Sequence, residues 1–218
     1  MAVITISREL GSGGSYIGRQ VAQTLGYHFV DKDTIEAVLV QYGFVEFSEE
    51  YDSLPGFWAR FDARRAELVD MLNRVIKALA QHGDVVILGR GSFAVLGGLA
   101  DVLHVRVKAP LPIRVRQVMV QQQIADADQA EVIVTESDRI RADFIDFSYR
   151  VQWDTAAPFD LVIDTAKVSP ELAVTWLVQT IRTWPEQPEA DRPTARALQV
   201  DSILADAVAN VLDCQVRH

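Results

Sequence analysis

Short apolar runs, separated by polar and glycine-containing segments, recur along the chain and predict the strands of a sheet. They lie at residues 2–7, 27–30, 85–88, 102–107 and 161–163. The run at 85–88 has no polar residue, which is typical of a parallel strand buried on both faces. Segments with apolar residues at helical spacing lie between the runs. This alternation favours an α/β fold with a five-stranded parallel sheet and helices on both faces.

The helices expected between these strands differ in length and in how clearly they begin. The sequence predicts them at residues 17–25, 34–42, 63–81 and, with a break near 125–128, over most of 112–149. A further helix should begin at Ser169-Pro170-Glu171, because serine favours the N-cap and proline the first helical position. Asp33 is expected to cap the helix at 34–42. An irregular stretch is expected around residues 53–56.

The C-terminal part of the chain has a different composition from the rest. Residues 185–194 are rich in proline and polar side chains, which indicates a linker. After them, residues 195–212 have the spacing of an amphipathic helix. We therefore expect one domain over 1–184, followed by a linker and a C-terminal helix over 185–218. That helix should dock either on its own domain or on a second copy of the chain, to form a homodimer. Its apolar face is made of Leu198, Ile203, Leu204, Val208, Val211 and Leu212.

Length and charge narrow the classes of ligand. A chain of 218 residues suits one α/β domain with a full core. The net charge of −9 disfavours a nucleic acid polymer as partner, because neutralising its phosphates requires a basic face. One cysteine and four scattered histidines give neither an internal disulfide nor metal-ligand spacing. With no membrane-length apolar run and no signal segment, the sequence predicts a cytoplasmic protein without membrane contact.

A glycine-rich turn follows the first expected strand and opens a helix. Such a turn directs backbone N–H groups and the positive end of the helix dipole at one point, which suits a phosphate. We therefore expect a phosphate group to bind there, with Ser15 or Tyr16 near the position where a P-loop hydroxyl would meet Mg²⁺. The motif G-x-x-x-x-G-K-[ST] is incomplete, because Gly14 stands in place of its lysine and Arg8 in place of its first glycine. The residues expected to bind the nucleotide are Gly11, Ser12, Gly13, Gly14, Ser15 and Tyr16.

Two other interpretations of this turn are open. It can be a tight turn without a ligand. It can also belong to a dinucleotide fold, since Asp31 follows at the usual ribose-binding position, about 20 residues after the glycines. The third glycine of that fingerprint is absent, because Tyr16 occupies its place.

Beyond the turn, an ordered set of segments resembles one family. The stretch ITISRELGSGGSYIGRQVAQTLGYHFVD at residues 4–31 resembles the opening of the cytidylate kinase-like family, whose loop reads S-R-x-x-G-S-G-G without a lysine. The likeness continues over residues 2–184 in VVILGRG, KAPLPIRVR, Asp138-Arg139, Tyr149, Trp153 and FDLVIDT. The resemblance implies a three-layer P-loop fold with a helical lid over about 114–149, and a nucleoside monophosphate kinase that uses ATP and Mg²⁺.

The resemblance also implies roles for individual residues. Arg90 matches an arginine that holds the phosphate of the acceptor, and a guanidinium can bind phosphate oxygens in pairs. Arg114, Arg139 and Arg141 match lid arginines that neutralise the transferred phosphoryl group. Asp31 is expected near the acceptor or a hydrated Mg²⁺.

Ordinary ion pairs are the alternative for these charged residues. Arg90 can instead form an ion pair that stabilises the fold. Asp138 with Arg141 and Arg139 with Asp143 have the spacing of pairs along one helix.

The missing lysine requires another cation near the outer phosphates. Arg8 leaves the first strand three residues before Gly11, and its side chain is long enough to reach back over the loop. We therefore expect Arg8 to be a catalytic cation, with a brace to a carboxylate such as Asp31 as the alternative.

The favoured function is phosphoryl transfer from ATP to a nucleoside monophosphate, with CMP the first acceptor to test. A P-loop kinase for another small molecule and a nucleotide-binding regulator without catalysis are the alternatives.

Overall fold

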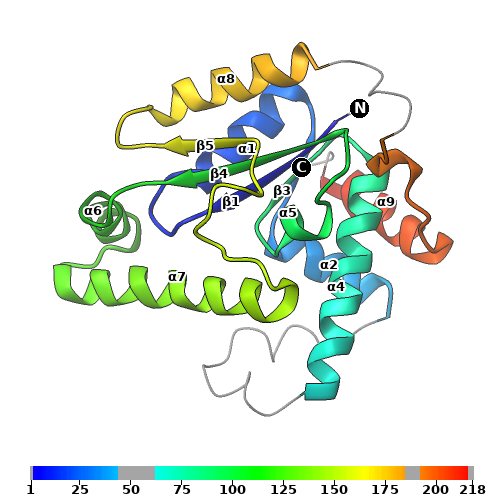
Figure 1. The fold of residues 1–218 in the computed structure, drawn as a ribbon, viewed down its shortest axis with the longest axis horizontal. Coiled ribbons are helices and arrows are strands. Elements are labelled where there is room, and N and C mark those ends of the chain that lie inside the picture. The colour runs from blue at the N-terminus through cyan, green and yellow to red at the C-terminus, as the bar shows by residue number, and fades with distance from the viewer. Residues whose placement is uncertain (1, 44–61, 185–191, 216–218) are drawn as a thin grey trace.

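A computed structural model describes residues 2–43, 62–184 and 192–215 (Figure 1). Its sheet confirms the predicted architecture: five parallel strands lie in the order β2-β3-β1-β4-β5. The predicted irregular stretch at 53–56 and residues 185–191 of the predicted linker lie outside the described residues. The strands are β1 (Val3–Arg8), β2 (His28–Val30), β3 (Val85–Leu88), β4 (Val102–Lys108) and β5 (Leu161–Asp164).

Helices cover both faces of the sheet and give the three layers that were predicted (Figure 1). One face carries α1 and α8, and the other carries α2, α4, α5 and α9. The helices are α1 (Gly14–Leu25), α2 (Lys32–Gln41), α4 (Asp62–His82), α5 (Ser92–Val95), α6 (Leu111–Gln122), α7 (Ala127–Tyr149), α8 (Pro170–Arg182) and α9 (Ser202–Gln215), with a short 3₁₀ turn η2 (Ala195–Ala197).

The central strand β1 shows how the sequence builds this core. Successive side chains of a strand point to opposite faces. Val3 therefore packs toward α2 and α4, while Ile4 and Ile6 pack toward α1 and α8. The carboxyl ends of the parallel strands meet at one edge of the sheet, and this edge carries the loops after β1, β2 and β3.

The observed N-cap of α8 is the predicted residue, whereas the observed N-cap of α2 differs from the prediction. Ser169 caps α8 as predicted, because its hydroxyl accepts a hydrogen bond from the Leu172 N–H at 3.2 Å. The prediction that Asp33 caps α2 is wrong. The cap is Asp31, whose carboxylate accepts from the Thr34 N–H at 3.3 Å. The extended backbone of Asp31 suits an N-cap, so α2 begins two residues earlier than expected.

The C-terminal helix docks on its own domain, the first of the two arrangements that the sequence left open. Leu204, Val208 and Leu212 are buried in the same core as α2 and α4, and only Ile203 of the predicted apolar face is largely exposed. The face that would have to meet a second copy is therefore mostly covered within the chain.

Among the described residues, no helix combines the length and the apolar character needed to cross a membrane.

Candidate functional site

The glycine-rich loop between β1 and α1 has the geometry of an anion site. Gly13 is the N-cap of α1 in a left-handed conformation, and no side chain caps the first turn. The first N–H groups of a helix lack partners within the helix, and the helix dipole adds positive potential there. The start of α1 is therefore suited to bind phosphate oxygens.

The serines of this loop have different surroundings. Ser12 is buried, and its hydroxyl donates to the Glu9 carbonyl at 2.8 Å. Thr165, after β5, donates to the Ser12 carbonyl at 2.9 Å and so ties the loop to the end of the sheet. Ser15 and Tyr16 are exposed in the first turn of α1. Ser12 therefore shapes the loop with its side chain, whereas the hydroxyl of Ser15 is accessible to a ligand.

Arg8 and Gly14 explain why the loop has no lysine. A Cβ atom added to Gly14 would lie 2.5 Å from the Cβ of Arg8, closer than real contacts allow. Any side chain at Gly14 therefore conflicts with Arg8. The far end of Arg8 reaches β3, since a Cβ on Gly89 would overlap its Nη1 atom. The expectation that Arg8 folds back over the loop is thus wrong, because its side chain runs from the start of α1 toward the end of β3.

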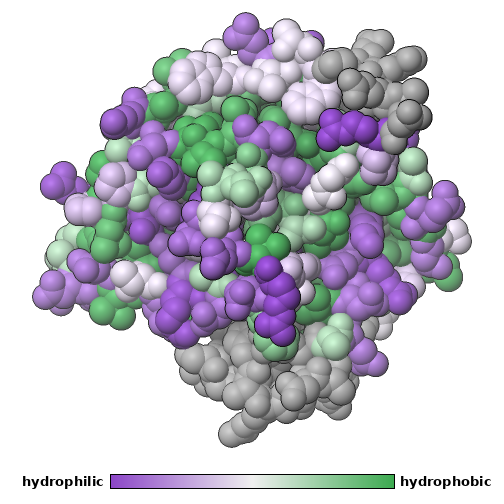
Figure 2. Space-filling view, in the orientation of Figure 1, coloured by the Kyte–Doolittle hydropathy of each residue, from purple (hydrophilic) through white to green (hydrophobic). Residues whose placement is uncertain are grey.

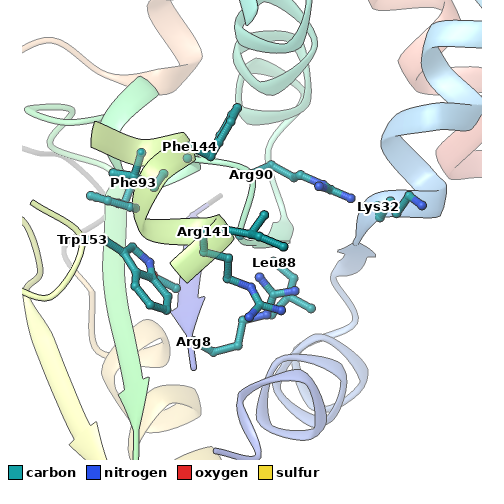
Figure 3. A pocket seen from close by; sticks show the side chains of 13 residues that line it. Arg8, Lys32, Leu88, Arg90, Phe93, Arg141, Phe144 and Trp153 are labelled. Carbon is teal, nitrogen blue, oxygen red and sulfur yellow. The ribbon is translucent and has the colours of Figure 1, made fainter. Parts of the chain in front are cut away.

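Next to the loop lies a cavity of about 320 Å³ (Figure 3). Its cationic lining residues are Arg8, Lys32, Arg90 and Arg141, and none of the described residues that line it is acidic. In a chain with net charge −9, this local excess of positive charge indicates an anionic ligand. The remaining wall is mostly apolar and includes Leu88, Phe93, Ile140, Phe144, Ile145 and Trp153.

Arg90 enters the cavity from a strained turn. Its φ is 58°, between Gly89 at 73° and Gly91 at 72°. A left-handed backbone costs a non-glycine residue about 1–2 kcal/mol, and such strain is often found at functional positions. A Cβ on Gly91 would overlap the ring of Tyr149, whose hydroxyl donates to Asn73 Oδ1 at 2.9 Å. The end of α7 thereby holds the turn that carries Arg90.

Arg114 does not line the cavity, although the sequence placed it among the catalytic residues. It is only 8% exposed. Its Nε donates to the Ala109 carbonyl at 2.9 Å, and its Nη1 pairs with the Asp138 carboxylate at 2.5 Å. Glu9 Oε2 lies 3.4 Å from the same Nε. Arg114 therefore joins the phosphate loop, α6 and α7 as a brace.

The other two lid arginines have separate positions on α7. Arg139 is 53% exposed at its side chain and pairs with Glu136 at 2.6 Å and Asp143 at 2.7 Å. Arg139 thus forms the ion pair along one helix that the sequence offered as the alternative to a lid role, and it does not line the cavity. Arg141 lines the cavity and also lies 3.5 Å from Asp138.

Asp31 has a structural setting apart from the cavity. Besides capping α2, its Oδ2 accepts from Arg19 Nη2 at 2.8 Å. It lines a broad depression beside β2 and is absent from the lining of the cationic cavity. The structure thus brings together Arg8, Arg90 and Arg141 of the predicted residues, and not Asp31, Arg114 or Arg139.

Sequence reasoning missed two features of the site. Lys32 was unassigned, although β2 pairs with β3 in a register, Val30 with Ile87, that brings the residues following them together. Arg106 is buried, and its guanidinium lies 4.4 Å from the centre of the Trp153 ring and 3.4 Å from Glu9. Burial lowers the pKa of Arg106, and the nearby Glu9 carboxylate opposes that shift. This group holds Trp153 against the cavity, and the residues involved are too far apart in sequence to suggest it.

No group of three or more His, Cys, Asp or Glu side chains capable of holding a metal occurs in the described part of the chain. A magnesium ion that is held mainly by nucleotide phosphates and water needs few protein ligands. The exposed Ser15 hydroxyl at the start of α1 fits such a site.

The cytidylate kinase-like family profile matches residues 3–167 of this chain. The cytidylate kinase of Pyrobaculum aerophilum is 27% identical over 177 residues, which cover 80% of this chain and 89% of that protein. The cytidylate kinase of Ignicoccus hospitalis is 28% identical over 176 residues, which cover 80% and 95%. A segment of 108 residues is 34% identical to uronate isomerase of Corynebacterium glutamicum, covering 49% of this chain but only 20% of that protein.

Solved structures share the fold. An uncharacterised protein from Eubacterium ventriosum superposes with a TM-score of 0.66 at 18% identity, over 84% of this chain and 99% of that chain. Shikimate kinase from Bacteroides thetaiotaomicron superposes with a TM-score of 0.50 at 16% identity, over 83% and 98%. These likenesses agree with the three-layer architecture around a parallel sheet.

Proposed function

Because the chain belongs to the cytidylate kinase-like family and is a phosphotransferase of the nucleoside monophosphate kinase type, we propose that it transfers the γ-phosphoryl group of ATP to a nucleoside monophosphate in the cytoplasm. CMP is the first acceptor to test, since several relatives are cytidylate kinases.

The observation that carries this proposal is the cationic cavity beside the glycine loop. An alcohol acceptor needs a general base near its hydroxyl, and a carboxylate commonly serves. An acceptor phosphate is already an oxyanion and needs only cations to hold it. Four cations and no acidic residue line the described cavity, which favours phosphate over alcohol as the attacking group. The apolar wall with Phe93 and Trp153 offers surfaces on which a base can stack.

The proposed mechanism rests on positioning and electrostatics. The loop N–H groups would bind the triphosphate, and the Ser15 hydroxyl would help to hold Mg²⁺, which would supply positive charge to neutralise the phosphates. An oxygen of the acceptor phosphate attacks the γ-phosphorus, and the bond to the bridging oxygen breaks to release ADP. Arg8 lines the cavity, where its guanidinium would stabilise the charge on the transferred phosphoryl group. Arg141 faces the same space from α7, and Arg90 holds the acceptor.

The proposed lid is smaller than residues 114–149. Val115, Val118, Ala130 and Val134 form a small apolar cluster between α6 and α7, separate from the main core. Phe144 instead belongs to the main core. We expect the second half of α6 and the first half of α7 to move over bound nucleotide, and the start of α6, held by Arg114, and the second half of α7 to stay fixed.

Binding of both substrates tests this proposal. Ligands that bind only the folded state raise its melting temperature. We expect ATP with Mg²⁺ and CMP each to raise it, and both together to raise it further. Hydrogen exchange in the second half of α6 and the first half of α7 should slow with both ligands present, because closure excludes water. A protein that no nucleoside monophosphate stabilises would contradict the proposal.

A further inference from the structure

Lys32 lies at a fixed place at the edge of the cavity. It is the first residue of α2, directly after the N-cap Asp31. The Asp31 carboxylate accepts from Arg19 of α1 and from Thr34 of α2, so the backbone before Lys32 is held from two sides. In the parallel register, Val30 pairs with Ile87, which places Lys32 opposite the turn that begins at Gly89.

The cations of the cavity form two groups. Figure 3 shows the side chain of Arg90 pointing from the turn after β3 toward the start of α2, where Lys32 lies. Arg8 and Arg141 point to a different part of the cavity, near Leu88. The Cβ of Arg8 packs against Gly14 of the phosphate loop, and its guanidinium lies beside Gly89, so Arg8 spans the distance from the loop to the cavity.

Phosphoryl transfer between two nucleotides places two phosphate groups in one cavity, and each carries charge that needs cations. We infer that Lys32, together with Arg90, binds the phosphate of the acceptor, while Arg8 and Arg141 contact the phosphoryl group in transit. This inference rests on the proposed function. It makes Lys32 a substrate-binding residue of the acceptor site.

An ion pair within α2 is the competing role. Lys32 Nζ lies 3.6 Å from Glu36 Oε1, at i,i+4 spacing. Both side chains are partly exposed, and pairs of this kind contribute little to stability. Glu36 does not line the cavity. Replacing each partner separately therefore distinguishes an ion pair from a ligand contact.

The test measures CMP and ATP affinity by calorimetry, and the acceptor KM and kcat, in Lys32→Met, Lys32→Arg and Glu36→Gln. Lys77→Met, an exposed residue of α4 outside the cavity, is the matched control. We expect Lys32→Met to weaken CMP binding and raise its KM about tenfold, because a charge-assisted contact to phosphate is lost. ATP affinity should change by less than about twofold, Lys32→Arg should keep most CMP affinity, and Glu36→Gln should not weaken it.

Different failures have different meanings. Unchanged CMP affinity in Lys32→Met, with wild-type protein that does bind CMP, would overturn this inference and leave the proposed function standing. Equal losses of melting temperature in Lys32→Met and Glu36→Gln, without a change in CMP affinity, would assign Lys32 to the ion pair. A wild-type protein that binds neither CMP, UMP, AMP nor GMP would reject the proposed function, and the role of Lys32 with it.

Discussion

Replacing Arg8 by alanine is expected to lower turnover by about a thousandfold, because the transferred phosphoryl group would lose a cation that lines the cavity. The structure supports this position, since Arg8 packs against Gly14 at one end and Gly89 at the other. No lysine can occupy Gly14 while Arg8 is present. Steady-state turnover at saturating ATP and CMP measures the effect.

The control separates catalysis from bracing. The melting temperature of the ligand-free Arg8→Ala variant should stay within a few degrees of wild type, and Arg182→Ala, an exposed arginine at the end of α8, should change neither quantity. If Arg8 only braced the loop, the variant would melt earlier and recover turnover at lower temperature. That result would reject Arg8 as the catalytic cation.

Replacing Arg114 by methionine is expected to destabilise the fold by about 1.5–3 kcal/mol, because its buried guanidinium is the partner that the partly buried Asp138 and Glu9 carboxylates share. The matched variant is Arg139→Met on α7. Its ion pairs are exposed to solvent, and such pairs contribute less than about 1 kcal/mol. Urea unfolding of both variants measures the free energies.

The two variants also test the assignment of these arginines. If Arg114 acts in chemistry instead, Arg114→Met would keep the stability of wild type and lose turnover. If Arg139→Met lost as much free energy of unfolding as Arg114→Met, the burial of the arginine would not determine how much its ion pairs stabilise the fold.

The sequence predicts the fold well because the signals for it are local. Each strand is a short apolar run, and the serine and proline that start α8 lie next to each other at Ser169 and Pro170. A few neighbouring residues likewise suffice to predict the glycine loop after β1. Alternation of strands and helices then leaves few topologies to choose from.

The site is harder to predict because its contacts join distant segments. Arg114 meets Glu9 and Asp138, and nothing in the local sequence indicates that these three charges lie together. An arginine near the lid therefore has the same local sequence pattern whether it braces the fold or lines a cavity. The direction of Arg8 depends on Gly14 and on Gly89, which is 81 residues away in the chain.

The positive charge of the site is confined to the cationic cavity and does not extend over the whole surface. Figure 2 shows hydrophilic and hydrophobic side chains interspersed over the visible face of the molecule. The net charge of −9 therefore gives no indication of a cavity lined by arginine and lysine. Only the register of β2 and β3 and the packing of α7 reveal that these cations meet.

Transfer of labelled phosphate from ATP to a nucleoside monophosphate tests the central claim most directly. Purified protein is incubated with Mg²⁺, ATP labelled at the γ-phosphate, and CMP, UMP, AMP or GMP in turn, and the labelled nucleoside diphosphate is quantified against ADP. The account predicts one labelled diphosphate for each ADP with at least one acceptor, at a rate that Arg8→Ala abolishes. Binding of ATP and a monophosphate without any labelled diphosphate would contradict it and identify a nucleotide-binding regulator instead.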